Sequence, residues 1–285
     1  MARSKKRPGM AIAGLILAVS LAVMLLSGAK LREARQIYRA GDRSYRSLSD
    51  RVRPAGPPVF DRQQAGSGPY GDDGADGADV ADVAAGNGPG TSANVAIPGM
   101  TIDFEALQSI NPDAVAWLYC PDTVIDYPVV RATEYDYYLH HLPDGALNSN
   151  GTLFTDYNWT GFSDRLMIVY GHNMRSGRMF GSLSNYKGQQ YYDAHPYLYL
   201  YTAEDGNFRI DLLYGCVIGA GQWRDRAFMF DVNLESLLSY AAYNTTFASG
   251  ARYEPGDRVV ALSTCSYEFD DARYVVLGVL RPEFS

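Results

Sequence analysis

The sequence predicts a mainly β domain, built as a barrel or a sandwich, behind an apolar N-terminal segment. Of the 285 residues, 47% are apolar and 13% aromatic, which is enough for a sizeable core. From about residue 99 onward, short runs rich in Val, Ile, Leu and Tyr alternate with Gly, Asp, Asn and Pro, as is typical of strands in an all-β fold. Eight such runs are found, at 116–120, 123–130, 151–156, 166–171, 197–202, 208–219, 258–265 and 273–280.

The N-terminal segment has the features of a membrane anchor. Residues 9–29 carry no charge and reach the ~20 residues that a helix needs to cross a bilayer. Basic residues precede them in a short tail, 1–8, as in a signal-anchor. Ser27 and Ala29 resemble a cleavage site, but the apolar stretch is longer than in a usual signal peptide, so we expect a retained transmembrane helix. Further basic residues follow in a stalk at 30–50, and charge counting alone leaves the orientation open.

Residues 51–98 differ in composition from both neighbours. They are rich in Gly, Ala, Asp and Pro with few large apolar groups, so burial cannot offset the loss of chain entropy. We expect a disordered, flexible spacer here, followed by one folded domain at 99–285. Residues 1–53 carry 12 Lys/Arg and 3 Asp/Glu, whereas the remainder has a formal charge of −16. This acidic body, with its basic residues scattered, argues against nucleic-acid binding.

Helices are expected before and between the strands. In residues 233–244 the apolar side chains recur at the spacing of one helix face, at Leu234, Leu237, Leu238 and Ala241. The other predicted helices lie at 102–111, 134–141 and 178–186.

The stretch ALSTCSYEFDDARYVVLGVL, 261–280, ends one predicted strand on a cysteine and begins the next on an arginine. If the two strands form a hairpin, Arg273 lies opposite Cys265 on the same face. A guanidinium near a thiol favours the nucleophilic thiolate and can donate hydrogen bonds to an oxyanion. From this pair alone, an inert buried thiol beside a charge at the barrel rim is equally compatible.

His172 is the histidine best placed to exchange protons with such a thiol. It directly follows a predicted strand, and Gly171 allows the backbone to bend there. The remaining histidines and cysteines are expected to be packing or surface residues: His140, His141, His195, Cys120 and Cys216. A disulfide between the last two is left open. No C-x-x-C or H-E-x-x-H string indicates a metal site, and we expect no cofactor.

Several motifs, in one order along the chain, resemble the sortase family. YGHNM at 170–174, LSTC at 262–265 and the arginine that opens the next strand carry this resemblance. The class B branch is the most similar, through IDYPVV at 125–130, YDYYLHH at 135–141, GTLFTDYNW at 151–159 and MFGSLSNY at 179–186. The resemblance covers about residues 101–281 and implies an eight-stranded sortase-like β-barrel with inserted helices.

The resemblance implies a cysteine transpeptidase. Cys265 would attack a carbonyl in a C-terminal sorting signal, usually at Thr–Gly or Thr–Asn, and form a thioacyl enzyme. His172 would protonate the leaving amine and later deprotonate an acceptor amine of peptidoglycan or its lipid-linked precursor. Arg273 would bind the substrate carbonyl and the oxyanion. By position, three further residues are candidates for the peptide-binding groove: Ser263, Leu139 and Trp223.

The resemblance also implies a location. The N-terminus would be cytoplasmic and the barrel extracellular, on a single-pass membrane protein that acts as a monomer. Two alternatives remain open: a membrane-anchored cysteine peptidase that uses water as acceptor, and a non-catalytic surface domain with a structural thiol.

Overall fold

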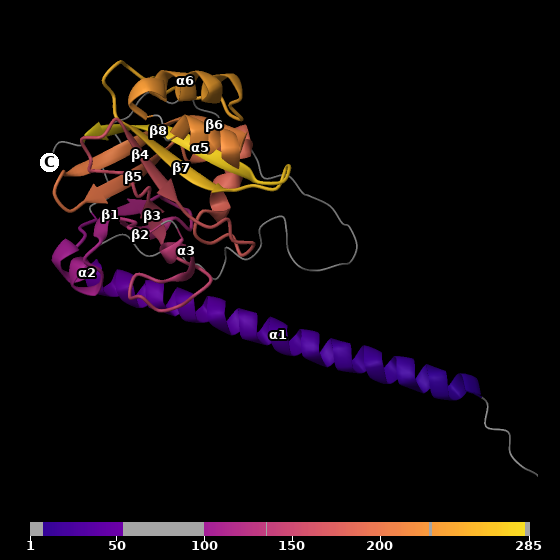
Figure 1. Ribbon diagram of the computed structural model, residues 1–285. Coiled ribbons are helices and arrows are strands. Elements are labelled where there is room, and N and C mark those ends of the chain that lie inside the picture. The colour runs from indigo at the N-terminus through magenta and orange to yellow at the C-terminus, as the bar shows by residue number, and fades with distance from the viewer. Residues whose placement is uncertain (1–7, 54–99, 135, 228–229, 283–285) are drawn as a thin grey trace, which may run out of the picture.

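Eight strands close into one barrel in the computed structural model, which describes residues 8–53, 100–134, 136–227 and 230–282 (Figure 1). The strand order is β1-β2-β3-β4-β7-β8-β6-β5, with β2–β3 and β4–β7 parallel. The bounds are β1 Ala114–Tyr119, β2 Asp126–Val130, β3 Leu153–Thr155, β4 Leu166–Tyr170, β5 Tyr197–Thr202, β6 Asn207–Gly219, β7 Val259–Cys265 and β8 Ala272–Pro282. The eight predicted strands are therefore confirmed, and closure of the sheet selects the barrel over the sandwich.

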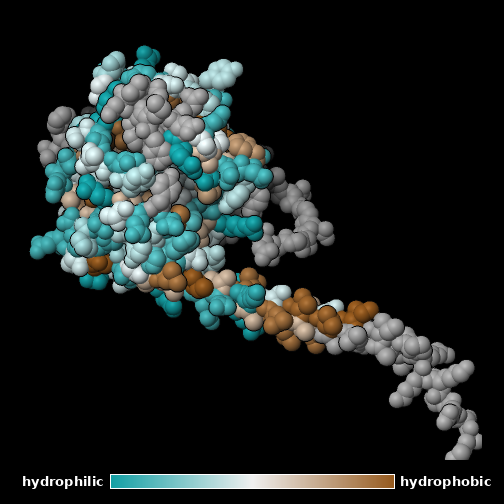
Figure 2. Space-filling view, in the orientation of Figure 1, coloured by the Kyte–Doolittle hydropathy of each residue, from teal (hydrophilic) through white to brown (hydrophobic). Residues whose placement is uncertain are grey.

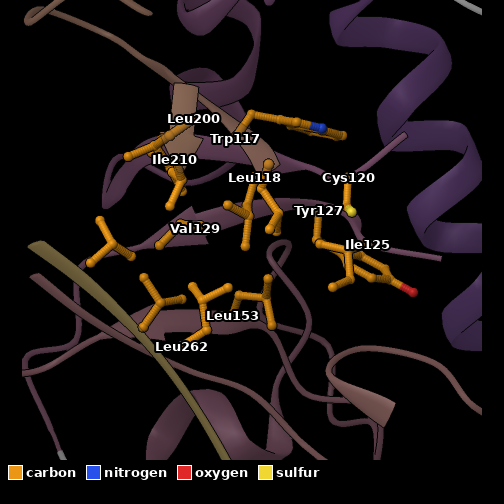
Figure 3. Packing of buried hydrophobic residues seen from close by; sticks show 14 of the residues in the cluster. Trp117, Leu118, Cys120, Ile125, Tyr127, Val129, Leu153, Leu200, Ile210 and Leu262 are labelled. Atoms are coloured by element: carbon orange, nitrogen blue, oxygen red, sulfur yellow. The ribbon is translucent and has the colours of Figure 1, made fainter. Parts of the chain in front are cut away.

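The barrel interior is filled by every second residue of the strands, as the pleat requires. Figure 3 shows Leu118, Val129, Leu153, Leu200 and Leu262 converging from five strands. All five side chains are fully buried. Burial of a leucine-sized side chain contributes roughly 1.5–3 kcal/mol, so this core holds the strand ends rigidly.

The outer face of β4, β6, β7 and β8 carries a second apolar cluster. Two helices cover it, α5 at Ala220–Ala227 and α6 at Phe230–Tyr243. The predicted apolar stripe of α6, with Leu234 and Leu237 at its centre, packs on Ala261 of β7 and its outward neighbours. The helix α5 was not predicted, because AGQWRDRA shows no apolar periodicity.

The shorter helices lie near the places that the sequence predicts. They are α2 at Phe104–Ile110, α3 at Tyr137–His140, a 3₁₀ helix η2 at Gly181–Lys187, and α4 at Gln189–Ala194. The Asp103 side chain caps α2 by accepting a hydrogen bond from the Ala106 amide at 2.9 Å. Of these four shorter helices, α4 alone has no counterpart among the predicted helices, and α5 is the other helix that was not predicted.

Helix α1, Pro8–Val52, is much longer than the predicted segment at 9–29. Figure 1 shows it passing beneath the barrel and projecting beyond it. Its last turns are part of the folded domain, because Tyr45, Leu48 and Val52 belong to the main core cluster. The predicted boundaries of stalk (30–50) and spacer (51–98) differ from this arrangement, since Val52 and Arg53 are buried against the barrel.

The outer part of α1 exposes apolar side chains, visible as the brown patch along the helix in Figure 2. They are Ile16, Leu17, Val19, Leu21, Val23, Met24, Leu25 and Leu26. Within the described part of the chain, no helix combines the length and hydropathy needed to cross a membrane. The side chains of residues 8–15 and of Ala18 lie outside that part, as do the tail residues 1–7 and nearly all of the predicted spacer.

Candidate active site

Cys265 and Arg273 are direct partners across the β7–β8 hairpin. Directly opposed residues of an antiparallel pair share a face, so both side chains leave the same side of the sheet. Ser263 lies two residues before Cys265 and therefore also faces outward. The predicted geometry of this hairpin is confirmed, and both Cys265 and Arg273 are half-buried.

His172 reaches the same edge because β4 runs parallel to β7. Tyr170, the last residue of β4, is the register partner of Ser263, which places His172 beside the end of β7. Two hydrogen bonds fasten this crossing: Thr264 Oγ1 donates to the Gly171 carbonyl at 2.7 Å, and Asn173 Nδ2 donates to the Cys265 carbonyl at 2.8 Å.

Gly171 is required by packing rather than by a strained turn. A Cβ at this position would lie 2.4 Å from Leu153 Cδ2 and 2.8 Å from Phe180 Cδ2, closer than side chains tolerate. The predicted bend before His172 therefore has a different cause, because the core closes directly onto the Gly171 backbone.

The His172 imidazole is held by a backbone group. Its Nε2 lies 2.8 Å from the Leu139 carbonyl oxygen, just inside α3. A carbonyl can only accept, so Nε2–H is the donor, and Nδ1 is the ring atom that can gain or release a proton. The neighbouring His140 ring is 6.5 Å away between centroids and is exposed at the surface.

One pocket joins these side chains. Its volume is about 180 Å³. It is lined by Ala132, Glu134, Leu139, Phe154, Thr155, Asp156, Tyr157, Tyr170, Gly171, His172, Ser263, Thr264, Cys265 and Arg273. Five of the six predicted site residues are therefore brought together.

Two of the predicted groove residues differ in their surroundings. Ser263 is buried on the pocket wall, and its Oγ has no hydrogen-bond partner among the described residues, so a bound peptide could pair with it. Trp223 is not brought to the pocket. It lies on α5, buried in the outer apolar cluster, and the geometry gives no support for its predicted place in the groove.

Asp156 is a pocket residue that the sequence reasoning did not single out. It is almost fully buried just beyond β3, accepts a hydrogen bond from the Asn158 amide at 2.9 Å, and lies 3.3 Å from the Tyr170 hydroxyl. Burial raises the pKa of its carboxyl. The signal was present in GTLFTD, where an acid ends an otherwise apolar strand.

The other two thiols are free but inaccessible. Burial raises the pKa of Cys120 to about 11 and that of Cys216 to about 12, so both stay protonated at neutral pH. No disulfide joins them, which settles the alternative that the sequence left open. Their predicted packing role is confirmed.

Comparison with known proteins places this site in a family, although no protein-family model matches the chain. Sortase B of Listeria monocytogenes is 32% identical over 183 residues, which cover 62% of this chain and 74% of the relative. Sortase B of Staphylococcus aureus is 25% identical over 179 residues, 61% of this chain and 73% of the relative.

Solved structures agree with these relatives. The crystal structure of Clostridium perfringens sortase B gives a TM-score of 0.58 at 28% identity and covers 62% of this chain and 99% of that one. Spy0129, a Streptococcus pyogenes class B sortase involved in pilus biogenesis, gives 0.57 at 26% identity, with 62% and 97% covered. A cysteine and an arginine paired across a hairpin, beside a histidine that follows a parallel strand of the same barrel, thus occur in a chain that belongs to the class B sortases, which are cysteine transpeptidases.

Proposed function

We propose that this transpeptidase cleaves a C-terminal sorting signal and transfers the protein to an amine of the cell wall or of its lipid-linked precursor. The observation that supports it most directly is the single pocket that contains Cys265, its register partner Arg273, and His172. A nucleophile, a proton carrier and a group that stabilises an oxyanion are what acyl transfer through a thioester needs, and the Arg273 cation can serve as the last of these.

In the first half-reaction, the Cys265 thiolate attacks the carbonyl carbon of the scissile bond. The Arg273 guanidinium stabilises the negative charge that develops on the carbonyl oxygen. When the C–N bond breaks, His172 Nδ1 gives its proton to the leaving amine, and the acyl group remains on Cys265 as a thioester.

In the second half-reaction, an acceptor amine attacks the thioester. His172 Nδ1 takes a proton from the attacking nitrogen as the new amide bond forms, and the Cys265 thiolate leaves. The Cys265 thiolate and the protonated His172 imidazole are thereby restored for the next cycle. The Ser263 hydroxyl, which has no hydrogen-bond partner in the described part of the chain, and the Leu139 side chain both lie on the pocket wall, and this supports a role for both in holding the peptide.

We further propose that residues 9–29 anchor the chain, with the N-terminus in the cytoplasm and the barrel outside. The uncharged run of residues and the exposed apolar side chains of α1 support the anchor. The orientation rests on the proposed transfer to the cell wall, which takes place outside the cell. Protease added to intact cells should digest the barrel, whereas digestion only after lysis would contradict this orientation.

The function can be tested by analysing products. The chain is incubated with a panel of peptides that contain Thr–Gly or Thr–Asn, with and without triglycine, and the products are identified by mass spectrometry. We expect an amide-linked product with triglycine. Release of the free acid alone, whatever amine is added, would indicate a peptidase instead.

Cys265→Ala is the control for this experiment. The thiol is small and half-buried at a strand end, so the substitution removes little packing and the variant should fold. It should show no turnover. Turnover near that of the wild type would contradict the assignment of the nucleophile.

A further inference from the structure

Helix α1 contacts both chain segments that surround His172, and we propose that it positions this side chain for proton transfer. One segment, 172–180, begins with His172 itself. The other, 138–152, includes the Leu139 carbonyl that binds the imidazole. The inference rests on the proposed function, because it assigns α1 a part in the reaction that His172 performs.

The 172–180 segment folds back on itself, so its far end is coupled to His172. The Phe180 amide donates to the His172 carbonyl at 2.9 Å, and Asn173 forms an isolated β-bridge with Met179. Met179 has a φ of 54°, a backbone conformation that few residues other than glycine adopt, and it closes the turn tightly. A displacement at the far end is therefore transmitted to the histidine.

Helix α1 holds that far end through an ion pair. Arg178 Nε lies 2.7 Å from Asp42 Oδ1, and the two side chains are only 16% and 12% exposed. Pairs that are shielded from water in this way interact more strongly than the exposed pairs of a protein surface. The Asp42–Arg178 pair thus ties the His172 loop to α1.

The second segment is tied to the same helix face. Gly151 packs directly on the carbonyl that receives the His172 hydrogen bond, since a Cβ there would lie 2.8 Å from the Leu139 oxygen. The Tyr45 hydroxyl of α1 donates to the Gly151 carbonyl. Tyr45 lies within one turn of Asp42, so one short stretch of helix contacts both segments.

Two more contacts fix the second segment along α1. Asn148 Nδ2 donates to the Ile37 carbonyl at 3.0 Å. Gly41 allows the close approach of Asn150, because a Cβ on Gly41 would lie 2.4 Å from Asn150 Nδ2. Roughly two and a half turns of α1, from Ile37 to Tyr45, therefore carry the donor, the acceptor and the small residue that this loop contacts.

Together these contacts determine the position of both groups in the hydrogen bond between His172 and the Leu139 carbonyl. The distance between His172 Nε2 and the Leu139 oxygen depends on two loops that belong to different parts of the barrel, and α1 contacts both of them. A displacement of about 1 Å in a reacting group can cost on the order of a hundredfold in rate. Asp42 and Tyr45 are thus positioning residues for His172.

The test uses the full 285-residue chain and the best peptide from the panel above. Asp42→Ala and Tyr45→Phe should each lower kcat. Asp42→Ala should lower kcat by about tenfold and change KM less than twofold, because it loosens the segment that contains His172 and a misplaced imidazole affects proton transfer rather than peptide binding. The double variant Asp42→Arg with Arg178→Asp, which reverses the pair, should recover most of the kcat. The rate of Cys265 alkylation by iodoacetamide against pH should shift in Asp42→Ala.

The control is Asp257→Ala, which breaks the pair between Asp257 Oδ1 and Arg281 Nη1 at 2.7 Å, at the end of β7 that lies away from the pocket. It should lower the melting temperature but leave kcat unchanged. An equal loss of kcat in this control would overturn the inference, because the effect would then be one of general stability.

His172→Ala separates this inference from the proposed function. Wild-type turnover in His172→Ala would refute the role of His172, and the inference with it. Loss of turnover in His172→Ala together with wild-type kinetics and an unshifted alkylation profile in Asp42→Ala and Tyr45→Phe would refute the inference alone.

Discussion

Replacing Arg53 with methionine tests how much the end of α1 contributes to the stability of the barrel. Arg53 Nη1 lies 2.9 Å from Asp126 Oδ1, and its guanidinium lies 5.6 Å from the centre of the Trp117 ring. Both charged side chains are only 3% exposed. Arg53→Met keeps an unbranched apolar chain beside Trp117 but removes the guanidinium that pairs with the buried Asp126 carboxylate.

The expected loss in the free energy of unfolding is large relative to the total stability of the domain. Removing one partner of a buried ion pair costs about 3–5 kcal/mol, whereas whole domains are stable by about 5–15 kcal/mol. Trp117 Nε1 donates to Asp126 at 2.8 Å, which partly solvates the remaining charge and favours the lower end of that range. At about 2–4 °C per kcal/mol for a domain of this size, the melting temperature should fall by roughly 6–12 °C.

The assay is thermal and urea unfolding followed by circular dichroism at pH 7. Arg53→Met with Asp126→Asn should recover most of the stability, because the buried carboxylate charge is then removed together with the guanidinium. Glu235→Ala is the control: its pair with Arg165 is 38% and 64% exposed and should contribute less than about 1 kcal/mol. A loss below 1 kcal/mol in Arg53→Met, or a double variant no more stable than the single one, would refute the reasoning.

The remaining predictions use the same protein. A chain that begins at residue 99 should unfold at a lower temperature than one that begins at residue 30, because only the longer one keeps the buried turns of α1; equal melting temperatures would show that α1 does not stabilise the barrel. A thiol reagent at pH 7.5 should label Cys265 first, since burial keeps Cys120 and Cys216 protonated, and comparable labelling of all three by mass spectrometry would contradict this. Burial raises the pKa of the Asp156 carboxyl, so the folded state holds this proton more tightly than the unfolded one, and stability falls as pH rises from about 4 through the raised pKa. Asp156→Asn should remove that fall, and melting curves with the same pH dependence in both proteins would exclude it.

The strands could be predicted because each carries its own signal. Alternating apolar residues bounded by Gly, Asp and Pro mark a strand without any knowledge of its partner, and the hairpin then places Arg273 opposite Cys265. His172 followed from its position at a strand end. The positions of Cys265, Arg273 and His172 follow from the strands that they end, begin or follow, so a single sequence is enough to predict them.

Contacts between distant segments could not be predicted in this way. The buried face of α1 includes Tyr45, Leu48 and Val52. Arginines surround them in the sequence, and this basic composition suggests a solvated stalk. Arg53 and Asp126 are 73 residues apart in the chain, so nothing local indicates that they pair. The surroundings of Trp223 could not be predicted, because they depend on how α5 and α6 pack, which the sequence AGQWRDRA does not reveal.

The two described stretches on either side of residues 54–99 meet in the folded domain. Arg53 Nη1 lies 3.0 Å from Met100 Sδ, and the Asp103 amide donates to the Val52 carbonyl at 2.8 Å, so the two ends of residues 54–99 are held together by the domain itself. A backbone cut anywhere between them would give two polypeptides that remain associated through the buried face of α1 and the Arg53–Asp126 pair. Nicking or lengthening this stretch would therefore not release the catalytic barrel from its N-terminal helix, and a release mechanism would have to act on α1 itself.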